Sequence, residues 1–330
     1  MGLGGIGQRH LRIFRELYKE AEIFAIRVKG SKFEIDNNLQ LKRNNIYEKY
    51  GVRELKSYKD LSDINPDISF VTNPTSLHIS SAKIMVENHI PCFIEKPISN
   101  SNEGVADLLK LSQKNSTQVM VGFMMRFHPQ AIKIKDFLSK GYAGRIYGVT
   151  VNVNSYMPSW HPYESYKDLY ASRRDLGGGV ILTESHELDL LHWFFGEAKL
   201  VNLLTGKFSN FQMDVEDNAT LFLKQKYLKH SFPSTIQLSF VQKEPIRRLL
   251  ILAEEAVIEW DIANSDLKIK TESGRSFEDK IEEFDRNSLF SKQISHMLNC
   301  LANKELPIND LASCMFSHET IMSCYESLDN

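Results

Sequence analysis

Three glycines at the start of the chain have a spacing that could hold a phosphate. Gly2, Gly4 and Gly7 form a G-x-G-x-x-G pattern directly before residues 8–21, which have helical periodicity. In a dinucleotide-binding turn such glycines permit the tight bend, the close approach of a pyrophosphate and the packing of the helix on the sheet. The free N–H groups at the helix N-terminus then bind the phosphate. A glycine-rich start to an unrelated helix is the alternative interpretation.

Two further positions carry side chains suited to proton transfer. Lys96 lies in the tripeptide Glu95-Lys96-Pro97 at the end of a predicted strand, where open α/β sheets bind their ligands. A cation there would stabilise a developing alkoxide. His186 has an ordinary pKa near neutrality, and Asp189 follows one helical turn later, where it could orient the imidazole or contact a substrate. The alternatives are a surface lysine paired with Glu95 and a histidine that caps a helix.

Strands and helices alternate around these residues in the first third of the chain. Strands are predicted at residues 22–28, 68–74, 91–97 and 117–125, and helices at 8–21, 75–90 and 100–115. Asn100 and Glu103 resemble a capping box at the start of the last helix. This order predicts an α/β domain over residues 1–124, a Rossmann-like doubly wound parallel sheet.

The remainder of the chain is richer in strands. They are predicted at residues 145–156, 217–225, 234–242 and 247–262, with helices at 288–303 and 310–328. In the first of these strands Val149, Val151 and Val153 alternate with polar residues, as in a sheet with one open face. Residues 125–330 are therefore predicted to form an α+β domain with an open-faced, mostly antiparallel sheet.

The bulk composition excludes several classes of protein. With 330 residues, 42% of them hydrophobic and 25% charged, the chain is not expected to be disordered. A net charge of −2 gives no basis for binding nucleic acid or an anionic membrane. No apolar segment approaches the length of a membrane span, and no signal peptide is visible. The four cysteines lack a metal-binding spacing, so we expect reduced thiols and a soluble, cytoplasmic protein.

Four motifs, in this order, resemble the Gfo/Idh/MocA family of NAD(P)-dependent oxidoreductases. They are GLGGIGQRH at residues 2–10, TNPTSLH at 72–78, EKP at 95–97 and GGGVILTESHELDLLHWFFG at 177–196. The segment GFMMRFHPQ, residues 122–130, resembles the members that act on sugars, often in bacterial surface-polysaccharide pathways. The resemblance implies that Lys96 holds the reacting oxygen and that His186 is the acid or base. The cofactor contacts that we expect are Gly2, Gly4, Gly5, Ile6, Gly7, Arg27, Asn73, Pro74, His78, Glu95 and Lys96, with a structural rather than a catalytic role for His78.

The sequence departs from the family pattern at two places. Family members have a strand before the glycines, so we expect an upstream strand in the natural protein. Many relatives carry an aspartate four residues before the histidine. Leu182 stands there, followed by Thr183, and Glu184 is the nearest carboxylate. The usual Asp–His relay is therefore in question, whereas Lys96 and His186 are retained.

Aromatic and basic residues around 160–174 predict contacts with a sugar. Aromatic faces pack on sugar rings, and arginines bind phosphate or carboxylate groups. A solvated loop with a structural tyrosine cluster is the alternative. The predicted substrate contacts are Arg126, Tyr163, Tyr166, Arg173 and Asp189, and the same region also carries Trp160, His161, Tyr170 and Arg174.

The residues after the strand at 22–28 bear on the choice of coenzyme. A turn that binds NAD usually places an acidic residue there, about 20 residues beyond the glycines, for the ribose 2′-hydroxyl. Here Arg27, Lys29, Ser31 and Lys32 occupy the region instead. Basic side chains attract a 2′-phosphate, so NADP(H) is favoured over NAD(H), with Arg27 as the first contact. A solvated basic turn without a ligand is the alternative.

These features together predict hydride transfer between a nicotinamide cofactor and a hydroxyl or keto carbon of a sugar, nucleotide sugar or cyclic polyol. An exposed sheet face suggests a homodimer or homotetramer. We expect no metal, nucleic-acid or membrane partner. One alternative is a reductase of the same fold that acts on a non-sugar. The other is a regulator that binds cofactor or sugar without turnover, which the lost aspartate favours and the retained Lys96 and His186 oppose.

Overall fold

The protein is described from a computed structural model, which covers residues 2–27 and 32–328. The first third of the chain contains two parallel sheets. In one, β1 (Ile23–Ile26) pairs with β4 (Val52–Leu55), and in the other β5 (Ser69–Val71), β6 (Cys92–Ile94) and β7 (Val119–Val121) lie in sequence order. Strands β6 and β7 are buried on both faces, which explains why they read as continuous apolar runs. The predicted Rossmann-like arrangement is confirmed.

The start of the chain lies between these two sheets. The Gly2 N–H donates to the Ile26 carbonyl at 3.4 Å, at the end of β1. The Gly2 carbonyl accepts a hydrogen bond from Thr72 Oγ1 at 2.8 Å, at the end of β5. In the part of the chain that the structure describes, no strand pairs with both β1 and β5. The upstream strand stays a prediction.

Helix α1 (Gly5–Leu17) carries an arm of the chain that the sequence did not predict. This arm contains the hairpin of β2 (Phe33–Ile35) and β3 (Leu41–Asn45), then α2 (Ile46–Tyr50) and, after β4, α3 (Leu61–Ile64). The Gln8 side chain accepts from the Ile35 N–H at 2.7 Å and donates to the Phe33 carbonyl at 3.0 Å. The hairpin is therefore fastened to the helix that follows the glycine turn.

Two local expectations are wrong. Asn100 and Glu103 do not form a capping box, because α5 (Val105–Lys114) begins only after Gly104, which has a φ of 72° and makes no side-chain cap. The single strand expected over 247–262 is two strands, β12 (Val241–Ala253) and β13 (Ala256–Asp261), which pair antiparallel. The turn between them consists of Glu254 and Glu255, without the glycine or proline that usually marks a turn.

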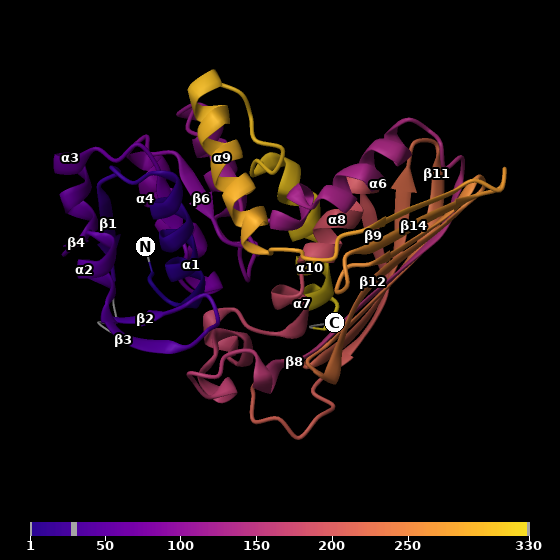
Figure 1. Ribbon diagram of the computed structural model, residues 1–330, viewed down its shortest axis with the longest axis horizontal. Coiled ribbons are helices and arrows are strands. Elements are labelled where there is room, and N and C mark those ends of the chain that lie inside the picture. The colour runs from indigo at the N-terminus through magenta and orange to yellow at the C-terminus, as the bar shows by residue number, and fades with distance from the viewer. Residues whose placement is uncertain (1, 28–31, 329–330) are drawn as a thin grey trace.

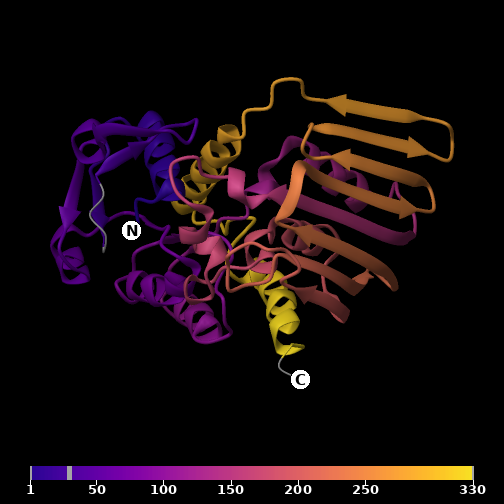
Figure 2. The same ribbon diagram turned by 90° about the horizontal axis from the view of Figure 1, so that it is seen from below.

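The second part of the molecule is built on an eight-stranded sheet in the order β15-β14-β13-β12-β8-β11-β10-β9. All neighbours are antiparallel except β8 and β11, which confirms a mostly antiparallel sheet. Helices α6 and α8 lie over one face, on the side toward the first sheet, and no described helix covers the other face (Figures 1 and 2). The bounds of the elements not yet given are α4 (His78–Glu87), α6 (Pro129–Ser139), β8 (Ile146–Tyr156), α7 (Val180–Thr183), α8 (His186–Phe195), β9 (Ala198–Gly206), β10 (Asn218–Tyr227), β11 (His230–Ser239), β14 (Asp266–Thr271), β15 (Ser276–Lys280), α9 (Asn287–Asn303) and α10 (Met315–Glu326).

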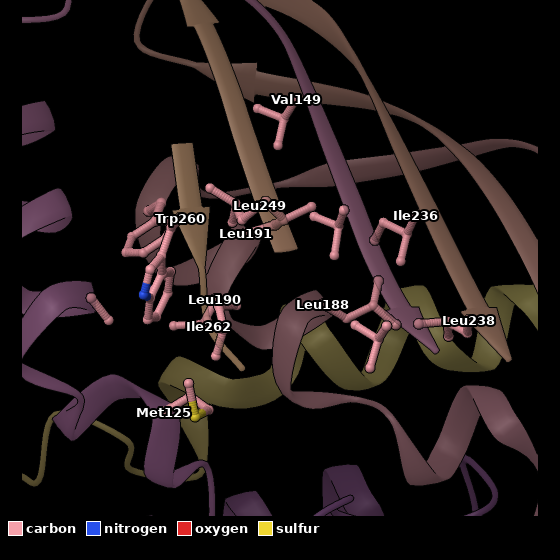
Figure 3. Packing of buried hydrophobic residues seen from close by; sticks show 14 of the residues in the cluster. Met125, Val149, Leu188, Leu190, Leu191, Ile236, Leu238, Leu249, Trp260 and Ile262 are labelled. Carbon is pink, nitrogen blue, oxygen red and sulfur yellow. The ribbon is translucent and has the colours of Figure 1, made fainter. Parts of the chain in front are cut away.

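The core lies between this sheet and helix α8. Figure 3 shows Leu188 and Leu191 of α8 lying against Val149 of β8, Leu249 of β12 and Ile236 of β11. Burial of each such aliphatic side chain contributes roughly 1.5–3 kcal/mol. Because α8 starts with His186, the packing that fixes the helix also fixes the position of that histidine.

Helix α9 and the segment after it join the two parts of the molecule. Figure 1 shows α9 between the first sheets and the large sheet, and its Phe290 contacts His10 of α1 with ring centroids 5.4 Å apart. Residues 309–311 then run antiparallel along the edge of β7, where the Val121 N–H donates to the Asn309 carbonyl at 2.9 Å. This segment covers a strand edge that would otherwise be open.

The four cysteines are buried and none is in a disulfide bond. Within residues 2–27 and 32–328, no helix has the length and apolar character needed to cross a membrane.

Candidate active site

The glycine turn leaves room for a ligand at the N-terminus of α1. Gly2 has a φ of 79°, and a Cβ on Gly7 would lie 2.1 Å from the Gly2 carbonyl oxygen, so both positions require glycine. Gly4 caps the helix, and a Cβ there would meet no atom within 4 Å. The space beside Gly4 is therefore open, which fits a pyrophosphate bound at the N-terminus of α1.

A tyrosine from the second part of the molecule closes over this turn. A Cβ on Gly5 would lie 2.8 Å from the Tyr163 hydroxyl oxygen. The Tyr163 ring stacks on His161, with centroids 5.1 Å apart and an interplanar angle of 16°. Tyr163 was predicted to contact the substrate. The structure places its hydroxyl at the start of α1, where it borders the predicted cofactor site.

The loops after β5 and β6 are tied together by His78. Its Nδ1 lies 2.8 Å from the Pro97 carbonyl and its Nε2 lies 3.0 Å from the Asn73 carbonyl. Burial lowers the pKa of His78. The Asn73 amide donates to Ser81 Oγ at 2.8 Å, and the Lys96–Pro97 peptide bond is cis. The role that these contacts give His78 is to hold Lys96 and Asn73 in place.

Lys96 reaches across to the helix pair α7–α8. Its Nζ donates to the Thr183 carbonyl at 2.6 Å. Its neighbour Glu95 is buried and accepts from His10 Nε2 at 2.6 Å. Burial raises the pKa of Glu95. The His10 hydrogen bond and nearby positive charge lower it by more than burial raises it, so the pKa lies below its ordinary value. A surface pair between Lys96 and Glu95 is therefore not what the structure shows.

His186 lies three residues beyond the carbonyl that Lys96 contacts. The residue is buried, and its ring lies 6.0 Å from that of Phe123 at an interplanar angle of 76°. Its Nδ1 is buried without a hydrogen-bond partner among the described residues. Burial lowers the pKa of His186 well below its ordinary value, and the positive charges of Lys96 and of two arginines act in the same direction. A neutral imidazole next to an ammonium group is the combination that proton abstraction from an alcohol requires.

Arg126 and Asp189, two of the predicted substrate contacts, pair with each other, and a direct role in substrate binding stays a prediction. Both are buried, and Arg126 donates from Nε and Nη2 to the two carboxylate oxygens of Asp189 at 2.8 and 2.6 Å. Asp189 also accepts from Ser317 Oγ at 3.0 Å, so it does not orient His186. This ion pair links η3 (Met124–Phe127) to α8. Removing either partner would leave the other charge buried and unpaired, so the pair supports the fold.

The polar groups of Arg173 and Tyr166 form hydrogen bonds with residues of neighbouring loops. The Arg173 side chain, 43% exposed, forms a two-point ion pair with Asp175 at 3.0 and 2.6 Å. The Tyr166 hydroxyl accepts from the Gln212 N–H at 3.2 Å. These contacts match the alternative of a solvated loop with structural tyrosines, and a direct role in sugar binding stays a prediction.

The glycines at 177–179 allow the α7–α8 pair to approach the first sheet. A Cβ on Gly177 would lie 2.8 Å from Thr75 Cβ, and a Cβ on Gly179 would lie 2.3 Å from Glu216 Oε1. Gly179 also has a φ of 111°. Glu216 accepts from the Tyr325 hydroxyl at 2.8 Å and from the Ile181 N–H at 3.3 Å. The triple glycine therefore positions the segment that carries Thr183 and His186.

The end of β1 carries a small basic group around an aromatic ring. The Arg27 guanidinium carbon lies 5.9 Å from the centroid of the Tyr47 ring, and Lys32 Nζ lies 5.5 Å from it. The predicted contributions of Lys29 and Ser31 fall outside the described residues. The cationic side chains expected at this strand end are therefore present at positions 27 and 32.

Comparison with known protein families agrees with this geometry. Residues 1–123 match the oxidoreductase family model GFO_IDH_MocA, with an NAD-binding Rossmann fold, and residues 131–259 match the GFO/IDH/MocA C-terminal domain.

The chain belongs to the Gfo/Idh/MocA family.

Individual relatives of this Gfo/Idh/MocA protein are distant. An uncharacterized oxidoreductase of Synechocystis sp. is 31% identical over 151 residues, which cover 43% of this chain and 39% of that protein. UDP-N-acetylglucosamine 3-dehydrogenase of Acidithiobacillus ferrooxidans is 25% identical over 202 residues, covering 61% and 57% of the two chains. The crystal structure of the WlbA dehydrogenase from Bordetella pertussis, in complex with NADH and UDP-GlcNAcA, has a TM-score of 0.77 at 21% identity. It covers 99% of this chain and 94% of that one.

Four residues near the site of this Gfo/Idh/MocA chain were missed or underrated by the sequence analysis. Arg9, Arg247 and Arg286 were not predicted, and Glu184 was considered only as a replacement for the family aspartate. Glu184 accepts from Ser155 Oγ at 3.3 Å. Arg9 stands inside the first motif and could have been singled out there. Arg247 and Arg286 carry no local signal, because a β-strand and a helix start bring them to the site from distant parts of the sequence.

Proposed function

We propose that the protein is an NAD(P)-dependent oxidoreductase that acts on a hydroxyl or keto carbon of a sugar, nucleotide sugar or cyclic polyol. The observation that carries this proposal is that Lys96 Nζ donates to the Thr183 carbonyl, three residues before His186, in a chain whose glycine turn is open at Gly4. The names of the relatives, a UDP-N-acetylglucosamine dehydrogenase and inositol 2-dehydrogenases, support a sugar-like substrate.

The chemistry divides between the cofactor and two side chains. A nicotinamide bound beyond the glycine turn supplies the hydride acceptor. Lys96 Nζ, now on the Thr183 carbonyl, donates a hydrogen bond to the substrate oxygen and stabilises its negative charge. His186 receives the hydroxyl proton as the carbon–oxygen bond becomes a carbonyl. The lowered pKa of His186 keeps the imidazole neutral at neutral pH, which suits alcohol oxidation better than reduction.

Substitution of Lys96 tests the proposal. We expect Lys96→Ala to abolish turnover while NADPH binding, followed by fluorescence, changes little, because the lysine acts on the developing charge. Lys140→Ala is the control, since Lys140 is exposed and pairs only with Asp136 on α6. Substrates are found by screening nucleotide sugars and polyols through nicotinamide absorbance. Near-wild-type turnover by Lys96→Ala would refute the role, and cofactor binding with no turnover on any substrate would favour the regulator.

For the coenzyme we propose a preference for NADP(H). The support is the pair of cations, Arg27 and Lys32, on the Tyr47 ring at the end of β1, where a 2′-phosphate would meet positive charge. We expect Arg27→Ala to weaken NADP(H) binding by about 10-fold or more and to leave NAD(H) binding unchanged. Titration of both coenzymes measures this. Equal or tighter binding of NAD(H) by the wild type would show that the basic residues form only a surface turn.

We further propose a homodimer or homotetramer formed through the open face of the large sheet. Large apolar side chains remain exposed on its strands, among them Tyr147, Val201, Leu204, Phe222 and Leu252. A second copy of the chain would remove this surface from water. Light scattering measures the mass of the assembly, and a monomer at micromolar concentration would contradict the proposal.

A further inference from the structure

Three arginines that the proposed reaction does not use gather around the candidate active site. They come from three separate elements: Arg9 from α1, Arg247 from β12 and Arg286 from the N-terminal end of α9. The Arg9 guanidinium carbon lies 5.3 Å from the ring centroid of Phe290, which stands one turn after Arg286. Helix α9 packs along α1 in this region, between the two parts of the molecule (Figure 1).

Arg247 approaches the site from the opposite side. Its Nε donates to Glu187 Oε1 at 2.5 Å, and Glu187 is the residue after His186. Glu187 is fully buried, and the Arg247 side chain is 20% exposed. The charges of Arg247 and Arg286 both act on His186, and each arginine charge acts on the other. Arg247 and Arg286 therefore both lie near the imidazole, and Arg9 lies near Arg286.

Two of the carboxylates near this point are already occupied by other partners. Glu187 is used by Arg247, and Glu95 is held by His10. Among residues 2–27 and 32–328, the guanidinium groups of Arg9 and Arg286 have no carboxylate within 4.0 Å and no hydrogen-bond partner. Arg247 Nη2 is also buried with no partner in the described structure. Two more carboxylates act on the arginines without forming an ion pair with them: Glu184 on Arg247 and Arg286, and Asp285 on Arg9.

Arginine side chains that lack a protein partner are available to bind an anion. Burial and the neighbouring Arg12 lower the pKa of Arg9. The Arg286 residue is exposed, yet desolvation by nearby protein atoms and the positive charges of Arg247 and Arg9 lower its pKa to about 10. Both shifts mean that the surroundings disfavour the positive charge. A bound anion would reverse them.

We propose that the substrate carries an oxyanion, a carboxylate or a phosphate, which Arg286 and Arg247 bind next to Lys96 and His186, with Arg9 at its edge. The inference rests on the proposed function and narrows its substrate to anionic sugars. The planar guanidinium fork matches the two oxygens of either group. Binding of the anion would also offset the positive charges that act on His186, so substrate binding would raise the pKa of the base.

Calorimetry in the presence of saturating NADPH, the proposed coenzyme, tests the proposal with four probes. D-glucuronate offers a carboxylate, UDP-glucose offers a diphosphate, inorganic phosphate offers the anion alone, and D-glucose offers neither charge. We expect at least one charged probe to bind about 10- to 100-fold tighter than glucose, with an affinity that falls as salt rises. The carboxylate and diphosphate arms show which source the site prefers.

A matched pair of variants locates the binding. We expect Arg286→Gln to weaken binding of the preferred anion by about 10- to 100-fold. Arg248→Gln should leave it unchanged, because Arg248 is the next residue of β12, points to the other face of the sheet and pairs with Asp261 at 3.1 Å. Arg286 makes no contact that the fold depends on, and circular dichroism checks that both variants fold.

Two results would overturn the inference. One is that no charged probe binds better than glucose, and the other is that the two variants lose affinity equally. Neither result depends on turnover. Oxidation of neutral polyols without any anion preference would leave the proposed function standing and remove only the anion site. Anion binding at Arg286 without turnover on any substrate would leave the anion site standing and remove the proposed oxidoreductase function.

Discussion

At the scale of single residues, the site depends on how two side chains are held. Lys96 Nζ is kept in place by one backbone carbonyl, that of Thr183, and could exchange this contact for a substrate oxygen. His186 lacks a carboxylate partner, since Asp189 is fully used by Arg126 and Ser317. Its protonation is therefore set by burial and by the surrounding cations rather than by an Asp–His relay.

The first prediction concerns His186. We expect His186→Gln to lower kcat by roughly 10²–10⁴-fold with a smaller change in KM, because the proton acceptor is lost while binding remains. In the wild type the lowered pKa should keep kcat/KM for alcohol oxidation constant as the pH falls through 6.5, where an ordinary imidazole would be half protonated, because kcat/KM reports the pKa of the free enzyme. Steady-state kinetics between pH 5 and 8 measure both effects.

A small loss in the His186 variant would point to Glu184 as the base. Glu184→Gln distinguishes the two possibilities, since the Ser155 hydroxyl can still donate to its amide oxygen. His230→Gln, on β11 away from the site, serves as the control. If His186→Gln is nearly fully active and Glu184→Gln is not, the assignment of the proton acceptor is wrong.

At the scale of elements, the short helix α7 decides where the active-site residues stand. It has only four residues and makes no side-chain cap. Glu216 supports its start by accepting from the Ile181 N–H, and Tyr325 of α10 in turn donates to Glu216. Burial raises the pKa of Glu216 above its ordinary value. The glycine at 179 is what allows this carboxyl group to lie directly against the backbone.

The second prediction tests this arrangement through Gly179→Ala. The added Cβ would lie 2.3 Å from Glu216 Oε1 at a φ of 111°, so the turn or Glu216 must move. We expect a loss of about 2–4 kcal/mol in the free energy of unfolding and a loss of activity. Gly274→Ala is the matched control, because Gly274 has a φ of 79° but a Cβ there would meet nothing within 4 Å.

Chemical denaturation compares the two glycine variants. The control should lose only about 1–2 kcal/mol, the cost of the left-handed backbone. The difference between the two variants isolates the contact with Glu216. Equal losses, or full activity in Gly179→Ala, would show that this contact does not position the site.

At the scale of the whole molecule, several buried histidines are kept neutral by the fold. Burial lowers the pKa of His128, of His192 and of His318 to about 4. His128 Nδ1 accepts from the Gln130 N–H, and His192 contacts the Thr320 hydroxyl. Neither ring nitrogen of His318 has a hydrogen-bond partner within the described residues.

The third prediction is a loss of stability in mild acid. Between pH 6.5 and about 4 the unfolded chain binds protons at these histidines and the folded protein does not, so the free energy of unfolding falls as the pH is lowered. Each histidine can contribute up to about 3 kcal/mol to this loss. Carboxyl groups with lowered pKa values, such as Glu34 and Asp217, lose their contribution at still lower pH. Urea unfolding at pH 7.5, 6 and 5 measures the trend.

His318→Leu provides the specific test of this pH dependence. Removing one titrating group should reduce the slope of stability against pH by about one proton between pH 4.5 and 6. His89→Asn is the control, since His89 is exposed and asparagine tolerates its positive φ of 57°. An unchanged slope in His318→Leu would mean that this histidine is already protonated in the folded protein.

The sequence by itself determined the features that are local. The spacing of Gly2, Gly4 and Gly7, the alternation of Val149 with its polar neighbour, and the strand-terminal position of Lys96 can each be read within a few residues. They predicted the two kinds of sheet and most of their strands. Local reading failed where the local signal was weak, as in the 33–45 hairpin and the Glu254–Glu255 turn.

Only the tertiary structure decided which polar side chains are partners. Arg126 and Asp189 are 63 positions apart and consume each other's hydrogen bonds, so two predicted substrate contacts became a buried link. Arg9, Arg247 and Arg286 converge from a helix, a strand and a helix start. Periodicity reports which face of an element is buried, but the partner of a buried charge depends on how distant elements pack, and that is set by the shape of the whole core.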